Sequence, residues 1–137
     1  ITADKIDTVL PKADILYLAM PETPGTKNLI SHKRLDLLKP SCGIVNIGRQ
    51  STMDYDALCE KLRTNKIAGA ILDVFAPEPI ELNSKLWQVP NLIITPHVSA
   101  DDGESYVRLT LDLFIKNLQL FISNKPLVNK VKKDLGY

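Results

Sequence analysis

Residues 43–62 read GIVNIGRQSTMDYDALCEKL and contain the pattern of one strand, one polar turn and one helix. The segment 43–47 is a short apolar run of the kind that forms a buried strand. Asp54 can cap a helix that continues to about residue 64. Three apolar side chains of that helix fall on one face at helical spacing: Tyr55, Leu58 and Leu62. The stretch therefore predicts a strand with a helix packed against it.

The same alternation extends through the rest of the chain. Three more apolar runs occupy residues 15–20, 68–75 and 92–95. A further helix is expected over 32–38, with Ser31 as its N-cap, Leu35 and Leu38 facing inward, and Pro40 after its end. The apolar runs are continuous, which is typical of parallel strands covered on both faces. The order of elements predicts the α/β class, with a doubly wound parallel sheet and functional residues in the loops after the strands.

A long helix is expected at about residues 100–123. One stripe of apolar side chains, at steps of three and four residues, would seat this helix on the sheet: Val107, Leu111, Phe114, Leu118 and Phe121. A second stripe points in another direction: Leu109, Leu113 and Leu120. Either the helix is deeply wrapped in its own domain, or the second stripe contacts a partner subunit or a further domain.

Composition and charge are those of an ordinary globular domain. The chain has 137 residues, of which 45% are hydrophobic and 24% are charged, which is enough for one domain with a core. A formal net charge of +1 creates no field that would attract nucleic acid or an anionic membrane. The longest apolar stretch, residues 67–75, is interrupted by Gly69 and Asp73 and is far shorter than a membrane helix. We therefore expect neither nucleic acid nor a membrane as a partner.

The two cysteines, Cys42 and Cys59, have neither CxxC spacing nor histidine neighbours. We therefore expect two reduced, partly buried thiols and a cytoplasmic location. The chain has no signal peptide, but it begins with Ile1, so a preceding segment is expected.

A polar or turn-forming cluster follows each predicted strand. Residues 21–26 follow the first strand, Arg49 the second, Asp73 and Glu78 the third, and Pro96 and His97 the fourth. The carboxyl ends of parallel strands lie along one edge of a sheet, so these residues can converge although they are far apart in the sequence. We therefore expect four of these side chains to form one site: Arg49, Asp73, Glu78 and His97.

The chemistry of such a site follows from its side chains. A histidine titrates near neutral pH, a neighbouring carboxylate fixes its tautomer, and an arginine binds a carboxylate through two bonds. Together they suit a substrate with a carboxylate beside a carbonyl or hydroxyl carbon. This group of residues has no activated serine or cysteine and no metal-ligand cluster, which disfavours acyl transfer and metal-dependent hydrolysis. Taken singly, each residue also has an ordinary interpretation: a surface Arg49, a strand-end Asp73, a turn-capping Glu78 and a loop His97.

Four motifs, in this order and spacing, resemble one protein family. They are LAMPETPGT at 18–26, LKPSCGIVNIGRQSTMDYDALCEKL at 38–62, GAILDVFAPEP at 69–79 and LWQVPNLIITPH at 86–97. They are similar to the NAD(P)-dependent D-isomer-specific 2-hydroxyacid dehydrogenases, which include glyoxylate/hydroxypyruvate reductases, D-lactate dehydrogenases and phosphoglycerate dehydrogenases. The resemblance implies a Rossmann-type domain and hydride transfer between NAD or NADP and a small 2-keto or D-2-hydroxy acid.

The resemblance also implies roles for single residues. Arg49 would hold the substrate carboxylate, His97 would protonate the carbonyl oxygen as hydride arrives, and Glu78 would hydrogen-bond His97. Asp73 would hold the nicotinamide carboxamide. The other matches to cofactor-lining positions are Pro21, Thr26, Ile47, Gly48 and Ser99, and the cofactor is also expected to contact Arg49 and His97. A homodimer is expected as well.

The chain departs from the family pattern at two points. Gln50 stands where the family usually has glycine, which would affect the active-site loop or the substrate pocket. No GxGxxG motif occurs, so residues 1–137 are expected to be the carboxyl-terminal portion of the dinucleotide-binding domain, without its first strands and glycine-rich turn. Two alternatives remain: a corepressor or scaffold protein on the same fold, and an inactive truncated chain.

Overall fold

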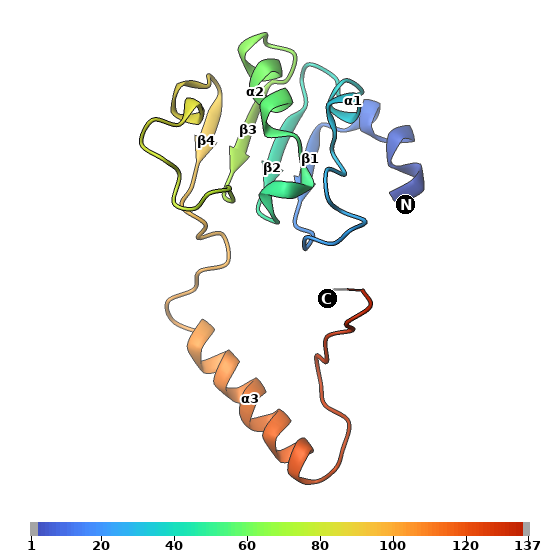
Figure 1. The fold of residues 1–137 in the computed structure, drawn as a ribbon, viewed down its shortest axis with the longest axis vertical. Coiled ribbons are helices and arrows are strands. Elements are labelled where there is room, and N and C mark those ends of the chain that lie inside the picture. The colour runs from blue at the N-terminus through green and yellow to red at the C-terminus, as the bar shows by residue number, and fades with distance from the viewer. Residues whose placement is uncertain (1–2, 136–137) are drawn as a thin grey trace. The chain divides into compact units, whose positions relative to one another are not determined.

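The structure is a computed structural model that describes residues 3–135 and divides into two compact units, one ending at Ser99 and the other starting at Ala100 (Figure 1). The strands of the first unit are β1 (Ile15–Leu18), β2 (Gly43–Asn46), β3 (Gly69–Leu72) and β4 (Leu92–Ile94). Its α-helices are α1 (His32–Leu35) and α2 (Tyr55–Arg63). Its 3-10 helices are η1 (Ala3–Thr8), η2 (Leu10–Lys12), η3 (Gln50–Thr52) and η4 (Lys85–Gln88). The second unit contains α3 (Tyr106–Ile122).

The four strands form one parallel sheet in the order β1-β2-β3-β4. The prediction of parallel pairing is therefore confirmed, and each strand lies within its predicted apolar run and ends one to three residues earlier. The last residues of the strands share one row across the sheet: Leu18, Asn46, Leu72 and Ile94. All four loops that follow the strands consequently begin at the same edge.

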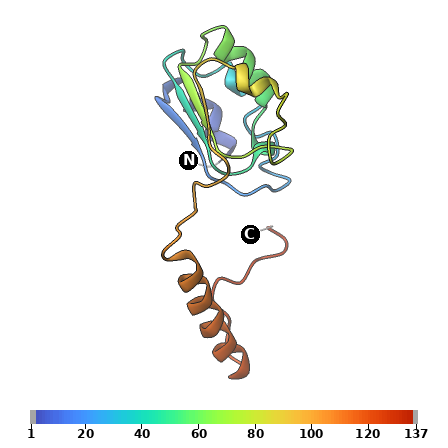
Figure 2. The ribbon, with the colours of Figure 1, turned by 90° about the vertical axis from the view of Figure 1, so that its left-hand side faces the viewer.

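The helices α1 and α2 cover one face of the sheet, and Figure 2 shows both on the same side of it. Side chains alternate between the two faces of a strand, and the inward set is buried against these helices. The sheet contributes Leu18, Ile44 and Leu72 to this core, each at most 1% exposed. The helical residues predicted to face inward are also buried: Leu35, Leu38, Tyr55, Leu58 and Leu62.

The opposite face of the sheet is open within the first unit. Tyr17, Ile71 and Ile93 point to this face and are 56%, 38% and 58% exposed. The expectation of strands covered on both faces is therefore not met within residues 3–99. The physical reason is that both α-helices of the unit follow parallel strands through crossovers of the same hand, which places them on the same face.

The helices differ from the prediction mainly at their ends. Asp54 accepts a hydrogen bond from the Ala57 amide at 3.0 Å, so the predicted cap of α2 is confirmed. Ser31 does occupy the N-cap of α1, but its side chain makes no capping bond, and α1 ends at Leu35 instead of residue 38. A buried lysine, Lys61 of α2, pairs with Asp36 directly after α1 and ties the two helices together.

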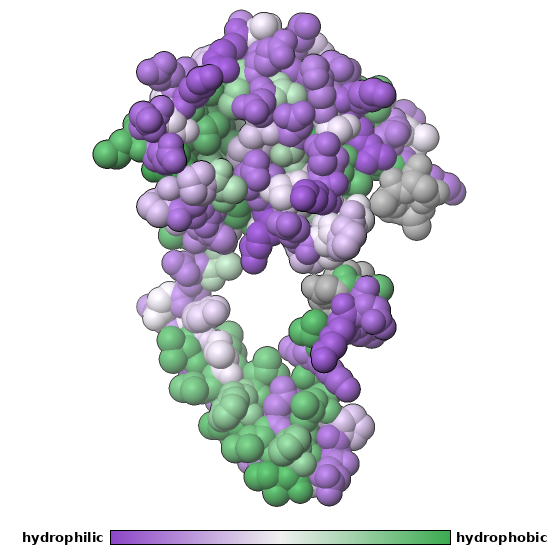
Figure 3. Space-filling model, in the orientation of Figure 1, coloured by the Kyte–Doolittle hydropathy of each residue, from purple (hydrophilic) through white to green (hydrophobic). Residues whose placement is uncertain are grey.

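In the second unit, α3 begins at Tyr106 and not near residue 100. Asp102 accepts hydrogen bonds from the amides of Glu104 and Ser105, and this turn precedes the helix. No residue of α3 is buried, and apolar side chains gather along it in Figure 3. The segment that follows α3, which we call the tail (residues 123–135), is bound to the helix. The Asn117 side chain donates to the Val128 carbonyl and accepts from the Val128 amide.

The tail changes the interpretation of the second stripe of α3. Leu113 and Leu120 lie on the same helix face as Asn117 and are half-buried, whereas Leu109 is 57% exposed. The residues of the first stripe are all exposed: Val107, Leu111, Phe114, Leu118 and Phe121. Within the second unit, part of the second stripe of α3 is therefore covered, and none of the first stripe is.

The two thiols are free, as predicted, but they are buried and not partly buried, with Cys42 at 0% and Cys59 at 7% exposure. Burial also raises the pKa of each thiol. Among the described helices, none has the length and apolar character needed to cross a membrane.

We expect Asp54→Ala to destabilise the first unit by about 1 kcal/mol, because the substitution removes the cap of α2. Ser31→Ala is the matched control, since that side chain makes no capping bond, and its effect should stay within about 0.5 kcal/mol. Urea unfolding of both variants measures the difference. Equal midpoints for the two variants would show that the Asp54 bond does not stabilise α2.

Candidate active site

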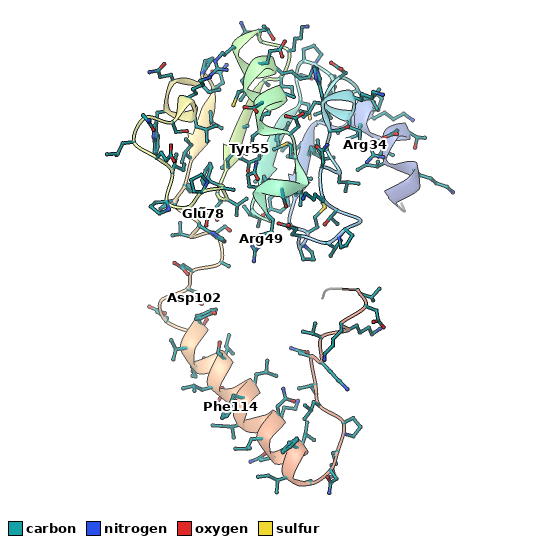
Figure 4. All side chains as sticks on the ribbon, in the orientation of Figure 1. Arg34, Arg49, Tyr55, Glu78, Asp102 and Phe114 are labelled. Carbon is teal, nitrogen blue, oxygen red and sulfur yellow. The ribbon has the colours of Figure 1, made fainter. Side chains whose placement is uncertain are left out.

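The residues predicted to form a site lie in the loops that follow the strands. Figure 4 shows Arg49 and Glu78 at the same edge of the first unit, with Tyr55 deeper in it. The amides of Ile47, Asp73 and Thr95 each continue the ladder by one bond to the neighbouring strand, at 2.9, 3.0 and 3.0 Å. This row of bonds fixes where each loop begins.

His97 and Glu78 form a hydrogen-bonded pair. His97 Nδ1 lies 2.8 Å from Glu78 Oε2, and the side chains are 43% and 35% exposed. An ionised carboxylate can only accept, so His97 must carry a proton on Nδ1 in this pair. This tautomer leaves Nε2 as the nitrogen that can exchange a proton with a ligand.

Glu78 is held in turn by the backbone of its own loop. Its other oxygen, Oε1, accepts from the Phe75 amide at 2.6 Å. The hydrogen bond from His97, followed by the bond from the Phe75 amide, lowers the pKa of Glu78 below its usual value. Glu78 is consequently ionised at neutral pH and oriented at both oxygens.

Asp73 holds the turn that follows His97. The buried carboxylate accepts from the amides of Val98 and Ser99 at 3.0 and 2.9 Å, and from the Thr95 hydroxyl. Burial opposes ionisation, but these bonds outweigh it and keep the pKa of Asp73 well below its usual value. His97 has a φ of 56°, in the left-handed region that is unfavourable for non-glycine residues. The bonds to Asp73 on either side of His97 stabilise that conformation.

Arg49 extends from the loop after β2. The backbone of Arg49 is extended, at φ −143° and ψ 143°, and the residue is exposed to solvent. The guanidinium Nη1 donates to the Gly48 carbonyl at 2.7 Å, and its positive charge contributes to the lowered pKa of Glu78. Arg49 therefore presents further guanidinium donors at the edge that carries Glu78 and His97.

The loops after β1 and β2 approach each other closely at Gly48. A Cβ atom at this position would lie 2.6 Å from the Met20 carbonyl oxygen, which is far inside contact distance. In the β1 loop, the Thr26 hydroxyl donates to the Pro21 carbonyl at 2.7 Å and so closes the turn 21–26. Four of the residues expected to line a cofactor thus belong to two loops held against each other: Pro21, Thr26, Ile47 and Gly48.

Asn46 and Tyr55 belong to the same edge, although neither was predicted to be a site residue. Asn46 is 0% exposed and its side chain binds the amide of Gly48, the carbonyl of Arg49 and the hydroxyl of Tyr55. A polar amide inside an apolar strand run was the available signal, because a buried amide must find hydrogen-bond partners.

A cavity of about 440 Å³ adjoins the His97–Glu78 pair. Most of its lining is apolar: Phe75, Pro79, Ile80, Trp87, Ile94 and Pro96. Gln50 lines a different cavity, of about 460 Å³, between α2 and residues 75–86. Within residues 3–135, no group of three or more metal-ligating side chains is close enough to hold a metal ion.

Comparison with known proteins assigns the first unit to a family. Residues 1–99 match the sequence profile of the D-isomer specific 2-hydroxyacid dehydrogenase, NAD binding domain. The chain belongs to the D-isomer specific 2-hydroxyacid dehydrogenases. It is 40% identical over 100 residues to glyoxylate/hydroxypyruvate reductase B of Pectobacterium carotovorum, covering 73% of this chain and 31% of the relative. It is also 36% identical over 126 residues to D-3-phosphoglycerate dehydrogenase of Synechocystis, covering 90% and 23%.

Solved structures of other dehydrogenases in this family have the same fold. An NADPH-dependent glyoxylate/hydroxypyruvate reductase from Sinorhizobium meliloti, in complex with NADP and sulfate, matches at a TM-score of 0.90 and 30% identity, over 100% of this chain and 44% of that one. A dehydrogenase from Xanthobacter autotrophicus, in complex with NADPH, matches at 0.90 and 30%, over 98% and 54%. The chain thus spans less than half the length of the curated relatives it matches.

The loops at the carboxyl edge of the sheet lie where dinucleotides bind in doubly wound sheets. Gly48 allows the β1 and β2 loops to pack directly against each other at this edge, because a side chain there would collide with the Met20 backbone. Asp73 remains a predicted cofactor contact, and the structure gives it a second task, the support of residues 98 and 99. Ser99 is the last predicted cofactor contact, and its backbone is oriented by the bond from its own amide to Asp73.

We expect Gly48→Ala to destabilise the protein by about 1–3 kcal/mol, because the added methyl group must displace the Met20 backbone. Gly25→Ala is the matched control: its Cβ would meet only the Thr23 hydroxyl oxygen, at 3.9 Å. Thermal unfolding of both variants measures the difference. A Gly48→Ala variant as stable as the parent would mean that the two loops are not closely packed.

Proposed function

We propose that the intact protein is an NAD(P)-dependent reductase that converts a small 2-keto acid, such as glyoxylate or hydroxypyruvate, to the D-2-hydroxy acid, and catalyses the reverse reaction. The observation that supports this most directly is the 2.8 Å bond between His97 and Glu78, at the sheet edge that also carries Arg49. A substrate whose carbonyl carbon is next to a carboxylate suits such a site, because the guanidinium can bind the carboxylate and the proton donor can act on the carbonyl oxygen.

Each side chain has a defined task in this reaction. Bound NADH or NADPH supplies the hydride that reduces the keto carbon. Arg49 binds the substrate carboxylate and so fixes the position of the neighbouring carbonyl. His97 gives the proton on Nε2 to the carbonyl oxygen, and Glu78 keeps Nδ1 protonated and stabilises the imidazolium. Asp73 acts on the reaction by holding the turn that carries His97.

The remaining predictions are supported less directly. A cytoplasmic enzyme agrees with two free thiols. A homodimer agrees with the apolar side chains that α3 leaves exposed in its own unit. A substrate other than nucleic acid or a membrane agrees with the formal net charge of +1. Assignment of residues 1–137 to one portion of the dinucleotide-binding domain remains a prediction.

Turnover by the intact protein tests the proposed reaction. We expect oxidation of NADPH or NADH when glyoxylate, hydroxypyruvate or a related 2-keto acid is added. Arg49→Lys should lower kcat/KM by about tenfold or more, because an ammonium group cannot replace two charge-assisted bonds from one planar group. Arg63→Lys, at the exposed end of α2, is the matched control and should match the parent.

Two results would contradict this proposal. Tight cofactor binding without turnover of any 2-keto acid would favour the scaffold alternative over the enzyme. A change of less than about twofold in kcat/KM for Arg49→Lys would remove Arg49 from the role of carboxylate ligand.

The pH profile tests the role of Glu78. The pKa of Glu78 is lowered in the folded protein. The ionised carboxylate therefore supports His97 at any pH above that pKa, and this support is lost as the pH falls through it. We therefore expect kcat/KM for reduction in the parent to fall on the acid side as Glu78 is protonated. Glu78→Gln should remove that fall, lower the rate near neutral pH and shift the optimum to lower pH. Identical profiles of variant and parent would exclude coupling between Glu78 and the catalytic acid.

A further inference from the structure

The buried hydroxyl of Tyr55 lies between the loops that carry Arg49 and Glu78. Tyr55 is the first residue of α2 and is 8% exposed. Its hydroxyl donates to the Val74 carbonyl at 2.8 Å and accepts from Asn46 Nδ2 at 3.1 Å. Burial raises the pKa of this phenol, so the hydroxyl keeps the proton that it donates.

On the β2 side, the connection from Tyr55 to Arg49 passes through Asn46. The Asn46 amide donates one hydrogen to the Tyr55 hydroxyl and the other to the Arg49 carbonyl, at 3.1 and 3.3 Å. Its oxygen accepts from the Gly48 amide at 3.0 Å. All three polar positions of this buried side chain are therefore used to shape the turn that projects Arg49.

On the β3 side, the connection from Tyr55 to His97 passes through a single peptide group. The carbonyl of Val74 and the amide of Phe75 belong to the same planar unit. Tyr55 binds the carbonyl, and the amide on the other side of the unit binds Glu78 Oε1 at 2.6 Å. Rotation of this peptide would disturb both bonds, so the Tyr55 hydroxyl determines the direction of the amide that orients Glu78.

We propose that Tyr55 and Asn46 are positioning residues that couple the substrate-binding arginine to the acid pair. A continuous series of hydrogen bonds runs from the Arg49 carbonyl through Asn46, Tyr55 and the 74–75 peptide to Glu78 and His97. Series of this kind polarise and strengthen their members, and they orient them together. The inference rests on the proposed function, because it assigns Arg49 and His97 their roles in reduction of a 2-keto acid.

The variant Tyr55→Phe isolates the hydroxyl. The ring stays in place through its edge-to-face contact with Phe75, at 6.3 Å between ring centroids and 81° between planes. Two bonds of the series are lost with the hydroxyl, and one hydrogen of the Asn46 amide is left unpaired. Tyr17→Phe is the matched control, since Tyr17 lies on the open face of the sheet and is 56% exposed.

In the intact protein, we expect Tyr55→Phe to raise KM for the 2-keto acid by roughly two- to tenfold, the range that corresponds to one hydrogen bond. The acid-side fall of kcat/KM should move to higher pH, because a displaced Phe75 amide no longer supports the ionised form of Glu78. Tyr17→Phe should leave both quantities at the parent values. A loss of thermal stability in Tyr55→Phe with unchanged KM and unchanged pH profile would overturn the proposal.

A double-mutant comparison tests whether Tyr55 acts through Glu78. In the Glu78→Gln background, Tyr55→Phe should no longer move the pH profile, because the titrating carboxyl is absent. An equal displacement in both backgrounds would mean that Tyr55 acts by another route, and would overturn the coupling.

Failure of the proposed reaction can be separated from failure of this inference. If the intact protein turns over no 2-keto acid, the proposed function fails, and carboxyl 13C NMR titration of Glu78 still measures the coupling. A higher Glu78 pKa in Tyr55→Phe than in the parent would support the series of hydrogen bonds. Equal Glu78 titrations in the two proteins would overturn it.

Discussion

The parallel register of the sheet is the constraint on which the candidate site depends. Because Leu18, Asn46, Leu72 and Ile94 lie in one row, the loops after the four strands start from a common edge. One additional ladder bond in each gap between neighbouring strands then fixes the direction in which each loop leaves. A shift of one residue in any pair would turn the inward face of that strand outward and separate the ionisable groups. The core and the site are therefore specified by the same pairing.

Backbone donors organise the charged groups at this edge. Asp73 accepts hydrogen bonds from two amides of the turn that follows His97. Glu78 accepts one from the Phe75 amide, three residues before it in its own loop. Hydrogen bonds to an ionised carboxylate favour its charged form, which is why the pKa of each of these acids lies below its usual value. Their negative charges hold loop conformations that no regular secondary structure supports, including the left-handed conformation of His97.

Gln50 shows how a departure from the family pattern is accommodated. It begins η3, directly after Arg49, and its side chain lines the cavity between α2 and residues 75–86. The turn that projects Arg49 is shaped by Asn46 and Gly48, which precede the arginine, and by Thr52, whose hydroxyl donates to the Arg49 carbonyl at 2.7 Å. The orientation of Arg49 thus depends on neighbours other than the residue that follows it.

The sequence alone determined the strands, the cap of α2, the inward helix residues and the loops that carry Arg49, Asp73, Glu78 and His97, because apolar spacing and capping are local properties. The resemblance to the family had already implied the bond between Glu78 and His97, which the structure contains. Only the tertiary structure decided that Glu78 also binds the Phe75 amide, that Asp73 supports residues 98 and 99, and that Asn46 and Tyr55 join the two loops. It also decided that Ser31 makes no capping bond and that one face of the sheet is open within the first unit. These features depend on register and loop direction between residues far apart in the chain, and side-chain periodicity contains no information about either.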